Sequence, residues 1–448
     1  MLTNDRNTQV LVNRIIANKF EINLIRITIS KGDEKLCGRG IVYQDDEGQL
    51  QLKFFSDYEY SQNERLRMIL GGGKASYGEG GIKSEFYVME GKDENCREYS
   101  CNQIDLRNHI DNVMDFRLLA ALNSSEKEGS STRVILIGKY QIPSTSMINR
   151  VTKIDESFWF TDNEDIWEIV VDDNFKIFVT NYDNYMDVLI HVIEEIDFAD
   201  VDNIVDSLNF VLGSELEPVF INVNNKGHKV QNRSNILKAN SIFSAPFTSN
   251  HNYGNDFTVN HNNLFCAYFK YICKDSRRLL PKIHRRIVSG SRNYLFAAAL
   301  ILSVQIEKIC KDNFSSYYKA DEDFIKALKE SVDLICNSEI KEKNRIVELI
   351  KNKIPSGSRN NFSVKNILKN LANENVISKS LIVKWESLRN ITAHGDTYEG
   401  DEVAPLLKNW FFCTNLYYQL IFNLIGYEGL YSWKEFDNNR LESYPIIV

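Results

Sequence analysis

Two residues in the last quarter of the chain combine a permanent cation with a side chain that exchanges a proton near neutral pH. Arg389 and His394 stand five positions apart, and Gly395 follows at once. Arg keeps its proton and offers a planar fork of donors that suits a phosphate, while His can act as a general acid or base. Such a pair is a minimal set of groups for cleaving a phosphodiester through a ribose hydroxyl, without a metal ion. Because a motif this short also occurs by chance, the surrounding elements have to support the interpretation.

The spacing of the two residues restricts how they can act together. Apolar residues predict a helix over Leu381–His394. Five residues turn through about 500° on a regular helix, which leaves Arg389 and His394 about 140° apart. Gly395 is a residue type that often follows a helix C-terminus, so we expect the helix to end where both side chains can reach one phosphate. The helix dipole there favours the imidazolium, which suits protonation of a leaving 5′-oxygen, and Arg389 would stabilise the transition-state charge.

These residues resemble the HEPN family. Arg389 is followed by the polar Asn390, by His394 within the family spacing, and by Gly395. HEPN proteins often carry a Glu and a Lys or Arg four positions apart on an earlier core helix, and Glu307 and Lys311 match that pattern. The pair would share one helix face, although an ordinary surface ion pair is the alternative. The resemblance implies a metal-independent ribonuclease without a cofactor, in which Asn390, Glu307 and Lys311 support the catalytic Arg389 and His394. It also implies a homodimer whose two motifs form one composite cleft.

The chain changes character near its middle, which predicts an α+β protein with two domains. Residues 1–242 are expected to form a β-rich domain, because runs of β-branched and aromatic residues alternate with Asp, Asn and Gly. The expected strands are Gly38–Tyr43, Leu50–Phe55, Arg133–Ile137, Ser157–Phe160, Trp167–Val171, Phe175–Val179 and Pro218–Ile221, with a hairpin turn at Asp45–Gly48. Helices are expected at Tyr185–Glu195 and Val201–Leu212, and residues 243–257 are interpreted as a linker.

Residues 258–448 show the apolar period of helices. Helices are predicted from Asn260, at Tyr294–Phe314, Phe324–Ile335, Ile346–Ile350, Val364–Leu371, Leu381–His394 and Val403–Leu424. Short connections between amphipathic helices favour an all-α bundle. The expected fold is therefore a β-rich N-terminal domain followed by an all-α, HEPN-like helical bundle.

This order of domains resembles the ApeA-type anti-phage abortive-infection proteins. Asp206–Gly213 followed by Pro218–Ile221 is similar to a helix-then-strand block of their N-terminal domain. The resemblance implies an endoribonuclease, toxic to its own cell, that cleaves RNA, with tRNA as one candidate. The N-terminal domain would hold it in check until a phage-derived trigger appears. Two alternatives stay open: a non-catalytic HEPN-type module that binds nucleotide or RNA, and a HEPN toxin controlled by a separate antitoxin.

A cluster of basic residues is a second candidate for contact with RNA. Six of them fall within thirteen positions: Lys274, Arg277, Arg278, Lys282, Arg285 and Arg286. Such clusters contact phosphates, and the nearby Tyr268, Tyr271 and His284 could stack on unpaired bases. A solvated basic helix face is the alternative.

The aromatic character of the last predicted helix bears on assembly. Trp410, Phe411, Tyr417 and Tyr418 offer more apolar surface than one bundle core needs, which favours a homodimer. Packing within a single core explains the same pattern.

Composition limits the remaining possibilities. Residues 258–448 hold 27 Lys and Arg against 21 Asp and Glu, whereas the whole chain has a net charge of −8. The acidic first part and basic second part therefore suggest different partners, and two domains that simply differ in surface composition are the alternative. Eight cysteines stand at scattered positions without zinc-like spacing, so reduced thiols are expected and no metal site is predicted. With neither a signal-peptide pattern nor a long apolar run, we expect a cytoplasmic protein that does not enter a membrane.

Overall fold

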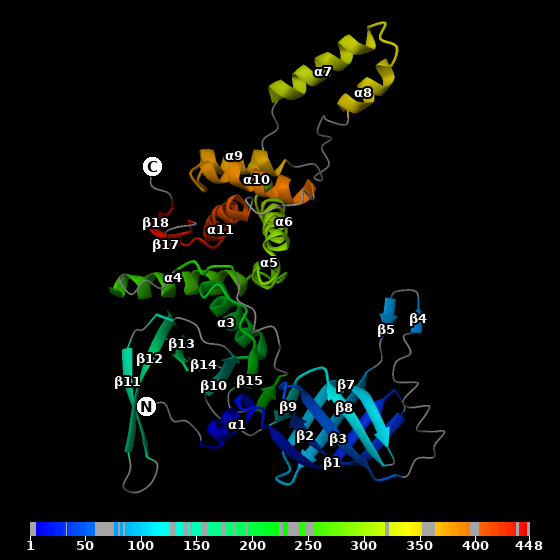
Figure 1. Cartoon of the computed structure of the whole chain (residues 1–448), viewed down its shortest axis with the longest axis vertical. Coiled ribbons are helices and arrows are strands. Elements are labelled where there is room, and N and C mark those ends of the chain that lie inside the picture. Colours follow the sequence, from blue (N-terminus) through cyan, green and yellow to red (C-terminus); the bar gives the residue numbers. More distant parts are fainter. Residues whose placement is uncertain are drawn as a thin grey trace. The chain divides into compact units, whose positions relative to one another are not determined.

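The structure is a computed structural model. It describes residues 6–32, 34–58, 76–78, 81–83, 86–110, 112–125, 131–137, 142–143, 146–153, 159–172, 175–182, 185–192, 196–223, 227–231, 242–247, 254–318, 322–351, 363–394, 403–435 and 439–445. The chain divides into two compact units (Figure 1), one formed by residues 1–240 and 251–262 and the other by 241–250 and 263–448.

The first unit is built on β-strands, as predicted. Its elements are α1 (Arg6–Ile16), β1 (Glu21–Lys31), β2 (Glu34–Gln44), β3 (Leu50–Ser56), β4 (Ser76–Gly78), β5 (Gly81–Lys83), β6 (Tyr87–Asp93), β7 (Glu98–Ile110), β8 (Val113–Leu118), β9 (Leu122–Ser125), β10 (Ser131–Ile137), β11 (Ser146–Lys153), β12 (Trp159–Asp172), β13 (Phe175–Asn181), β14 (Tyr185–Val192), α3 (Phe198–Val211), β15 (Pro218–Val223) and β16 (Gly227–Val230). Fourteen of the described strands join in the order β11-β12-β13-β14-β10-β15-β16-β9-β7-β6-β1-β2-β3-β8.

One part of this sheet closes on itself. Strand β8 pairs with β3 and also with β7, so β7, β6, β1, β2, β3 and β8 form a closed ring (Figure 1). Apolar side chains fill its interior, among them Ile27, Phe54, Met89, Ile104 and Phe116, which are at most 1% exposed. The alternation of buried and exposed residues along β6 is the period-two pattern of a strand with one apolar face.

The expected hairpin and several expected strands are present. Strands β2 and β3 pair antiparallel, and the turn between them includes Gly48 with φ of 78°, a backbone conformation that glycine adopts without strain. Trp159 and Phe160 of the strand predicted at Ser157–Phe160 belong to the same strand β12 as the predicted Trp167–Val171, and Ser157 and Phe158 lie outside the described residues.

The helix predicted at Tyr185–Glu195 is wrong for the part that the structure describes. Tyr185–Val192 is strand β14, which pairs with β10 and β13 on its two sides. The apolar residues of this segment fit a helix and a buried strand equally well, and pairing with two neighbouring strands decides the outcome. The predicted helix at Val201–Leu212 is confirmed as α3, which begins at the N-cap Asp197 with a capping box to Asp200.

The second unit is mainly helical, as predicted. Its helices are the C-terminal part of α4 (Gly254–Ile272), α5 (Leu279–Gly290), α6 (Leu295–Asn313), the short 3₁₀ helix η2 (Ser315–Tyr317), α7 (Glu322–Cys336), α8 (Lys343–Lys351), α9 (Val364–Asn373), α10 (Ser380–His394) and α11 (Val403–Ile425). The N-terminal part of α4 belongs to the first unit, where Asn262 bonds to the indole of Trp167 and to the carbonyl of Glu168.

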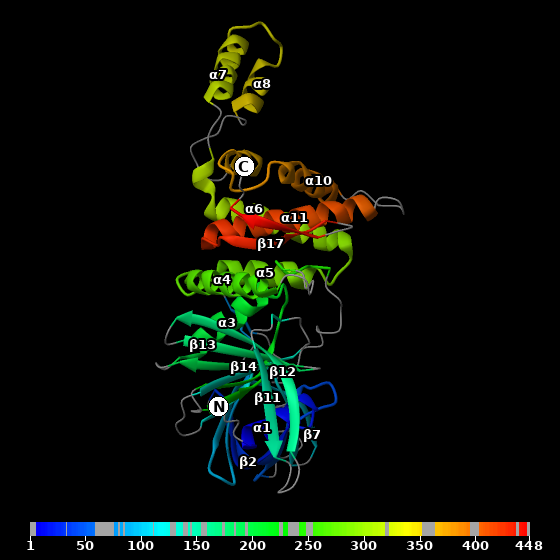
Figure 2. The same ribbon diagram turned by 90° about the vertical axis from the view of Figure 1, so that its left-hand side faces the viewer.

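Three helices form the centre of the second unit. Helices α6, α10 and α11 pack against one another (Figure 2). Helix α11 is buried on nearly all sides between Trp410 and Phe422, with Trp410 at 0% and Tyr417 at 1% exposure. A helix that is apolar all round is expected at the centre of a bundle. Trp410, Tyr417 and Tyr418 are therefore core residues of one chain, and the dimer surface that we predicted from them is not available.

A β-hairpin that we did not predict completes this unit. Strands β17 (Gly429–Trp433) and β18 (Arg440–Tyr444) pair antiparallel. Residues 243–247, which belong to the linker expected at 243–257, pack beside the hairpin, because the backbone nitrogen of Ser432 donates to the carbonyl of Pro246 at 2.8 Å. Phe243 and Phe247 of this segment are buried. Residues 248–253 of the expected linker lie outside the described residues.

Candidate functional site

The predicted Glu307 and Lys311 meet Arg389 in one cluster of charges. Lys311 lies one turn beyond Glu307 on α6, with its Nζ 3.6 Å from Oε2 of Glu307. Nε of Arg389, on α10, donates a hydrogen bond to Oε1 of the same carboxylate. Glu307 therefore uses both of its oxygens, one for each cation. A carboxylate shared in this way helps to hold the guanidinium in one direction.

A pocket of about 290 Å³ opens at this cluster. Helices α6, α9 and α10 and the residue before α9 contribute its lining: Glu307, Lys311, Ser363, Val364, Lys365, Trp385, Glu386, Arg389 and Asn390. The pocket thus brings together four of the five residues predicted to form the site. Its charged lining consists of three cations and two carboxylates, which leaves an excess of one positive charge.

A second ion pair crosses the same pocket. Nζ of Lys365, in the first turn of α9, lies 2.6 Å from Oε1 of Glu386 on α10. In both ion-paired groups the carboxylate is the more buried partner. The side chains of Glu307 and Glu386 are 17% and 29% exposed, whereas those of Arg389, Lys311 and Lys365 are 47%, 50% and 48% exposed. The pocket therefore presents cations to the solvent, with their carboxylate partners underneath.

Packing beneath the pocket holds the helix that carries Arg389. Trp385 is 3% exposed and its indole nitrogen donates to the carbonyl of Ser303 on α6 at 3.4 Å. Leu381 and Leu388 of the same helix are fully buried. On the α11 side, Asn409 donates to the hydroxyl of Ser387 at 3.1 Å. These contacts set the rotation of α10, so that Glu386, Arg389 and Asn390 line the pocket.

His394 is the last residue of α10. The helix end was expected between Arg389 and His394 or just after them, and the helix is continuous from Ser380 to His394, so it does not end between the two residues. The side chain of His394 and the whole of Gly395 lie outside the described part of the chain. The structure thus places the backbone of His394 on the same helix as Arg389, and the meeting of the two side chains at one phosphate stays a prediction.

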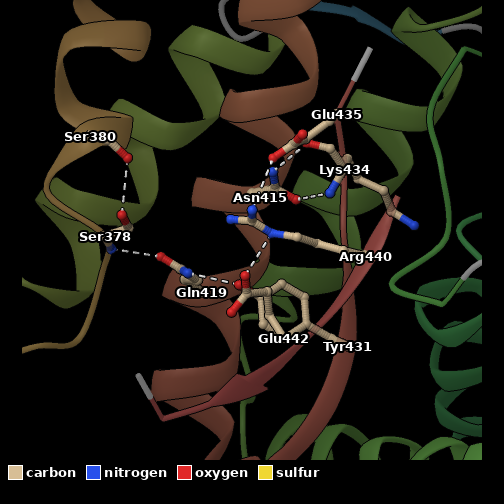
Figure 3. Close-up of polar contacts among 9 residues, drawn as sticks. All are labelled: Ser378, Ser380, Asn415, Gln419, Tyr431, Lys434, Glu435, Arg440 and Glu442. Carbon is tan, nitrogen blue, oxygen red and sulfur yellow. Dashed lines mark hydrogen bonds and ion pairs between the residues drawn. The ribbon is translucent and has the colours of Figure 1, made fainter. Parts of the chain in front are cut away.

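A polar network fixes the start of α10 against the C-terminal hairpin (Figure 3). Gln419 on α11 accepts a hydrogen bond from the backbone nitrogen of Ser378 at 2.9 Å, and its amide donates to the hydroxyl of Tyr431 at 2.8 Å. The Gln419 side chain is 1% exposed, so both of its bonds form away from water. Breaking a bond of this kind leaves a buried polar group unsatisfied, which costs about 1–3 kcal/mol.

A second buried amide on α11 bonds to the backbone just after strand β17. The side-chain amide of Asn415 donates to the carbonyl of Lys434 and accepts from its backbone nitrogen, both at 2.8 Å, a contact seen in Figure 3. The Lys434 side chain is fully buried, and no described residue bonds to its Nζ. Burial lowers the pKa of Lys434 to about 7, because the charged ammonium loses its hydration.

The predicted basic cluster forms an exposed face of α5 and the turn before it. Lys274, Arg277, Lys282, Arg285 and Arg286 are exposed, and Arg278 is half-buried. Asp275 accepts bonds from the backbone of Arg277 and Leu279 and lies 3.7 Å from the Arg277 guanidinium, which offsets part of the charge. No residue of this segment lines the pocket at Arg389.

The aromatic residues expected beside the basic cluster are placed differently. Tyr268 is fully buried, and His284 is 1% exposed with Nδ1 at 3.1 Å from the hydroxyl of Tyr417. Neither can stack on a base, so that expectation is wrong for both residues. They lie on the apolar faces of amphipathic helices, so their rings pack in the core. Tyr271 is half-buried.

Sequence reasoning missed Lys365, Glu386 and Ser363. Glu386 had a usable signal, because it precedes Arg389 and Asn390 by three and four positions and so shares their helix face. Lys365 and Ser363 had none. They reach the pocket only through the packing of α9 against α6 and α10, and no local pattern specifies that contact.

Another pocket, of about 560 Å³, lies in the first unit. Its charged lining is Arg26, Lys92, Glu90 and Glu98, and Lys92 pairs with Glu98 at 2.7 Å. Because its opposite charges balance, this pocket does not favour a phosphate as the one at Arg389 does.

No helix in the described residues is long and apolar enough to span a membrane. Nor does any group of three or more His, Cys, Asp and Glu side chains in that part of the chain have an arrangement that could hold a metal ion. Comparisons with family models, curated proteins and solved structures found no match to this chain.

Proposed function

We propose that the helical unit is a metal-independent endoribonuclease of the HEPN type. The observation that carries this proposal is the pocket at Arg389, where Glu307 holds Arg389 and Lys311 at a half-exposed, net cationic surface. A phosphodiester carries negative charge, and more develops as the transition state forms. Preoriented cations at this position are the electrostatic term that usually contributes most to catalysis.

The proposed reaction uses the substrate's own nucleophile. The ribose 2′-hydroxyl attacks the adjacent phosphorus while the bond from phosphorus to the 5′-oxygen breaks, which gives a 2′,3′-cyclic phosphate and a free 5′-hydroxyl. His394 would transfer the proton at the 2′- or 5′-oxygen. Arg389 would bind the non-bridging oxygens, and Lys311 would add a second positive charge. Asn390 lines the pocket beside Arg389 and offers an amide donor for the same phosphate.

The biological setting is part of the same proposal. The chain would act in the cytoplasm as an anti-phage effector that causes abortive infection, with the strand-rich unit restraining the nuclease until a phage-derived trigger binds. The acidic first part of the sequence and the basic second part support different partners for the two units.

A binding module without catalysis is the second candidate. In its favour, the described lining of the pocket supplies three cations, Lys311, Lys365 and Arg389. Cations alone suffice to bind a nucleotide or an RNA phosphate.

The two candidates differ in the products they leave. Purified protein would be incubated with total RNA in EDTA, and the ends of any fragments analysed. The nuclease predicts fragments with 2′,3′-cyclic phosphate and 5′-hydroxyl ends. Intact RNA that is nevertheless retained by the protein would support the binding module and contradict the nuclease.

A further inference from the structure

The pocket at Arg389 has two separate centres of positive charge. One is Arg389 with Lys311, held by Glu307, and the other is Lys365, held by Glu386. Their anchoring points on α10 differ, because Glu386 precedes Arg389 by three residues, about 4.5 Å of helical rise. The pocket therefore offers a second cation, Lys365, in an ion pair separate from the one at Arg389.

The second centre has the features of an anion site. Lys365 is half-exposed at the pocket, and its partner Glu386 is the more buried of the two. An arriving anion can therefore reach the ammonium from the solvent side while Glu386 stays in place. Ser363 and Val364, at the amino end of α9, also line the pocket, and the helix dipole at that end adds to the charge of Lys365.

We propose that this pocket binds two consecutive phosphates of one RNA strand, the scissile phosphate at Arg389 and its neighbour at Lys365. Lys365 is then a substrate-binding residue that sets which linkage lies at Arg389. The naming of one phosphate as scissile rests on the proposed ribonuclease function. The presence of two phosphate subsites rests on the pocket alone.

Binding can be measured separately from cleavage. A fluorescent oligonucleotide with 2′-O-methyl groups at every position lacks the attacking hydroxyl, so it reports affinity alone. Fluorescence anisotropy against salt would compare wild type with Lys365→Gln, Lys365→Arg and Lys369→Gln. Lys369 is a matched control, because it is exposed on the same helix but does not line the pocket.

The expected result is a loss of RNA affinity that is specific to the change at Lys365. Lys365→Gln should weaken binding about five- to ten-fold and reduce the slope of log affinity against log salt by about 0.7, the value for one phosphate contact on a single strand. Lys365→Arg should restore most of the affinity, and Lys369→Gln should have little effect. Equal affinities of the two Gln variants, or no binding by wild type, would overturn the proposal.

A second experiment tests the adjacency of the two phosphates. Methylphosphonate groups, which carry no charge, would replace the linkages of the oligonucleotide one at a time. The penalty of Lys365→Gln should disappear at one linkage, and that of Arg389→Gln at the next linkage. Coincident or separated positions would overturn the two-phosphate arrangement.

The two proposals fail in distinguishable ways. If wild type shows this adjacent pattern but leaves unmodified RNA intact, the ribonuclease function is wrong and the two subsites stand. If wild type cleaves RNA but Lys365→Gln behaves as Lys369→Gln does, the Lys365 subsite is wrong and the nuclease stands.

Discussion

Glu307 and Arg389 stand 82 positions apart in the sequence and form an ion pair that joins helix α6 to helix α10. Glu307 also holds Lys311, so one carboxylate positions two cations at the same pocket. Half-exposed ion pairs contribute little to stability, in general about 0–1 kcal/mol. We infer that the value of this arrangement lies in orienting Arg389 toward a phosphate.

Replacing Glu307 by Gln should therefore reduce activity more than stability. Without the anionic partner, Arg389 loses its fixed direction, and we expect kcat/KM for RNA cleavage to fall about ten-fold or more. The free energy of unfolding should change by about 1 kcal/mol or less. Asp312→Asn is the control, because it removes another ion pair of α6, with Lys308 at 3.0 Å, outside the pocket. Similar cleavage by Glu307→Gln and Asp312→Asn would show that Glu307 does not orient Arg389.

The basic face of α5 predicts a separate effect on RNA affinity. Changing Arg285 and Arg286 to Gln removes two exposed charges without touching the buried side of the helix. If they contact phosphates, RNA binding should weaken and the salt slope should fall by about 1.4, since each phosphate contact on a single strand contributes about 0.7. An unchanged slope in a filter-binding titration would assign this face to solvation.

Lys434 predicts a pH dependence of stability. Its pKa of about 7 in the folded chain lies below its ordinary value of 10.5, so between these values the unfolded chain binds a proton that the folded chain does not. Stability therefore rises with pH in this window, by up to ~1.4 kcal/mol per unit, and the cost of charging the buried amine is fully present below pH 7.

Lys434→Met removes this titration while keeping the shape of the side chain. Compared with wild type in urea unfolding, Lys434→Met should be more stable at pH 7, and its advantage should shrink as the pH approaches 9. Lys408→Met, an exposed change on α11, should keep the pH dependence of wild type. A constant difference between Lys434→Met and wild type across this range would contradict the assignment.

The sequence predicted the elements of the fold better than their contacts. The hairpin of β2 and β3 and the helix α10 followed from local turn chemistry and apolar period. Strand β14 did not follow from the sequence, because its apolar residues fit a helix and a buried strand equally well. Pairing with its two neighbouring strands makes it a strand. The same limit applies to the site. Glu307 and Lys311 shared a helix face by their spacing, whereas the meeting of Lys365 with Glu386 depends on how two helices pack.

A fourth prediction concerns the surface through which two copies of the chain would assemble. We expect that surface on α6 and not on α11. Trp410, Tyr417 and Tyr418 on α11 are buried, but Leu300 and Val304 on α6 are 39% and 46% exposed. Their spacing places them on the same stripe of α6 as Glu307 and Lys311. We expect a homodimer formed through this stripe, beside the pocket, so that Val304→Asp lowers the mass in light scattering to that of a monomer and reduces cleavage. Val259→Asp, at a 54% exposed position on α4, is the control. A wild type that is monomeric and fully active would contradict the shared cleft.

Variants of Arg389 and His394 test the proposed ribonuclease function most directly. RNA cleavage would be followed in EDTA for wild type, Arg389→Ala, His394→Ala and, as a control, the exposed His191→Ala. Loss of the proton-transferring group or of the oriented cation should each lower the rate about a hundred-fold or more. His191→Ala should match wild type, and all variants should unfold at similar temperatures. Cleavage by His394→Ala at a rate near that of wild type would contradict the proposed ribonuclease function.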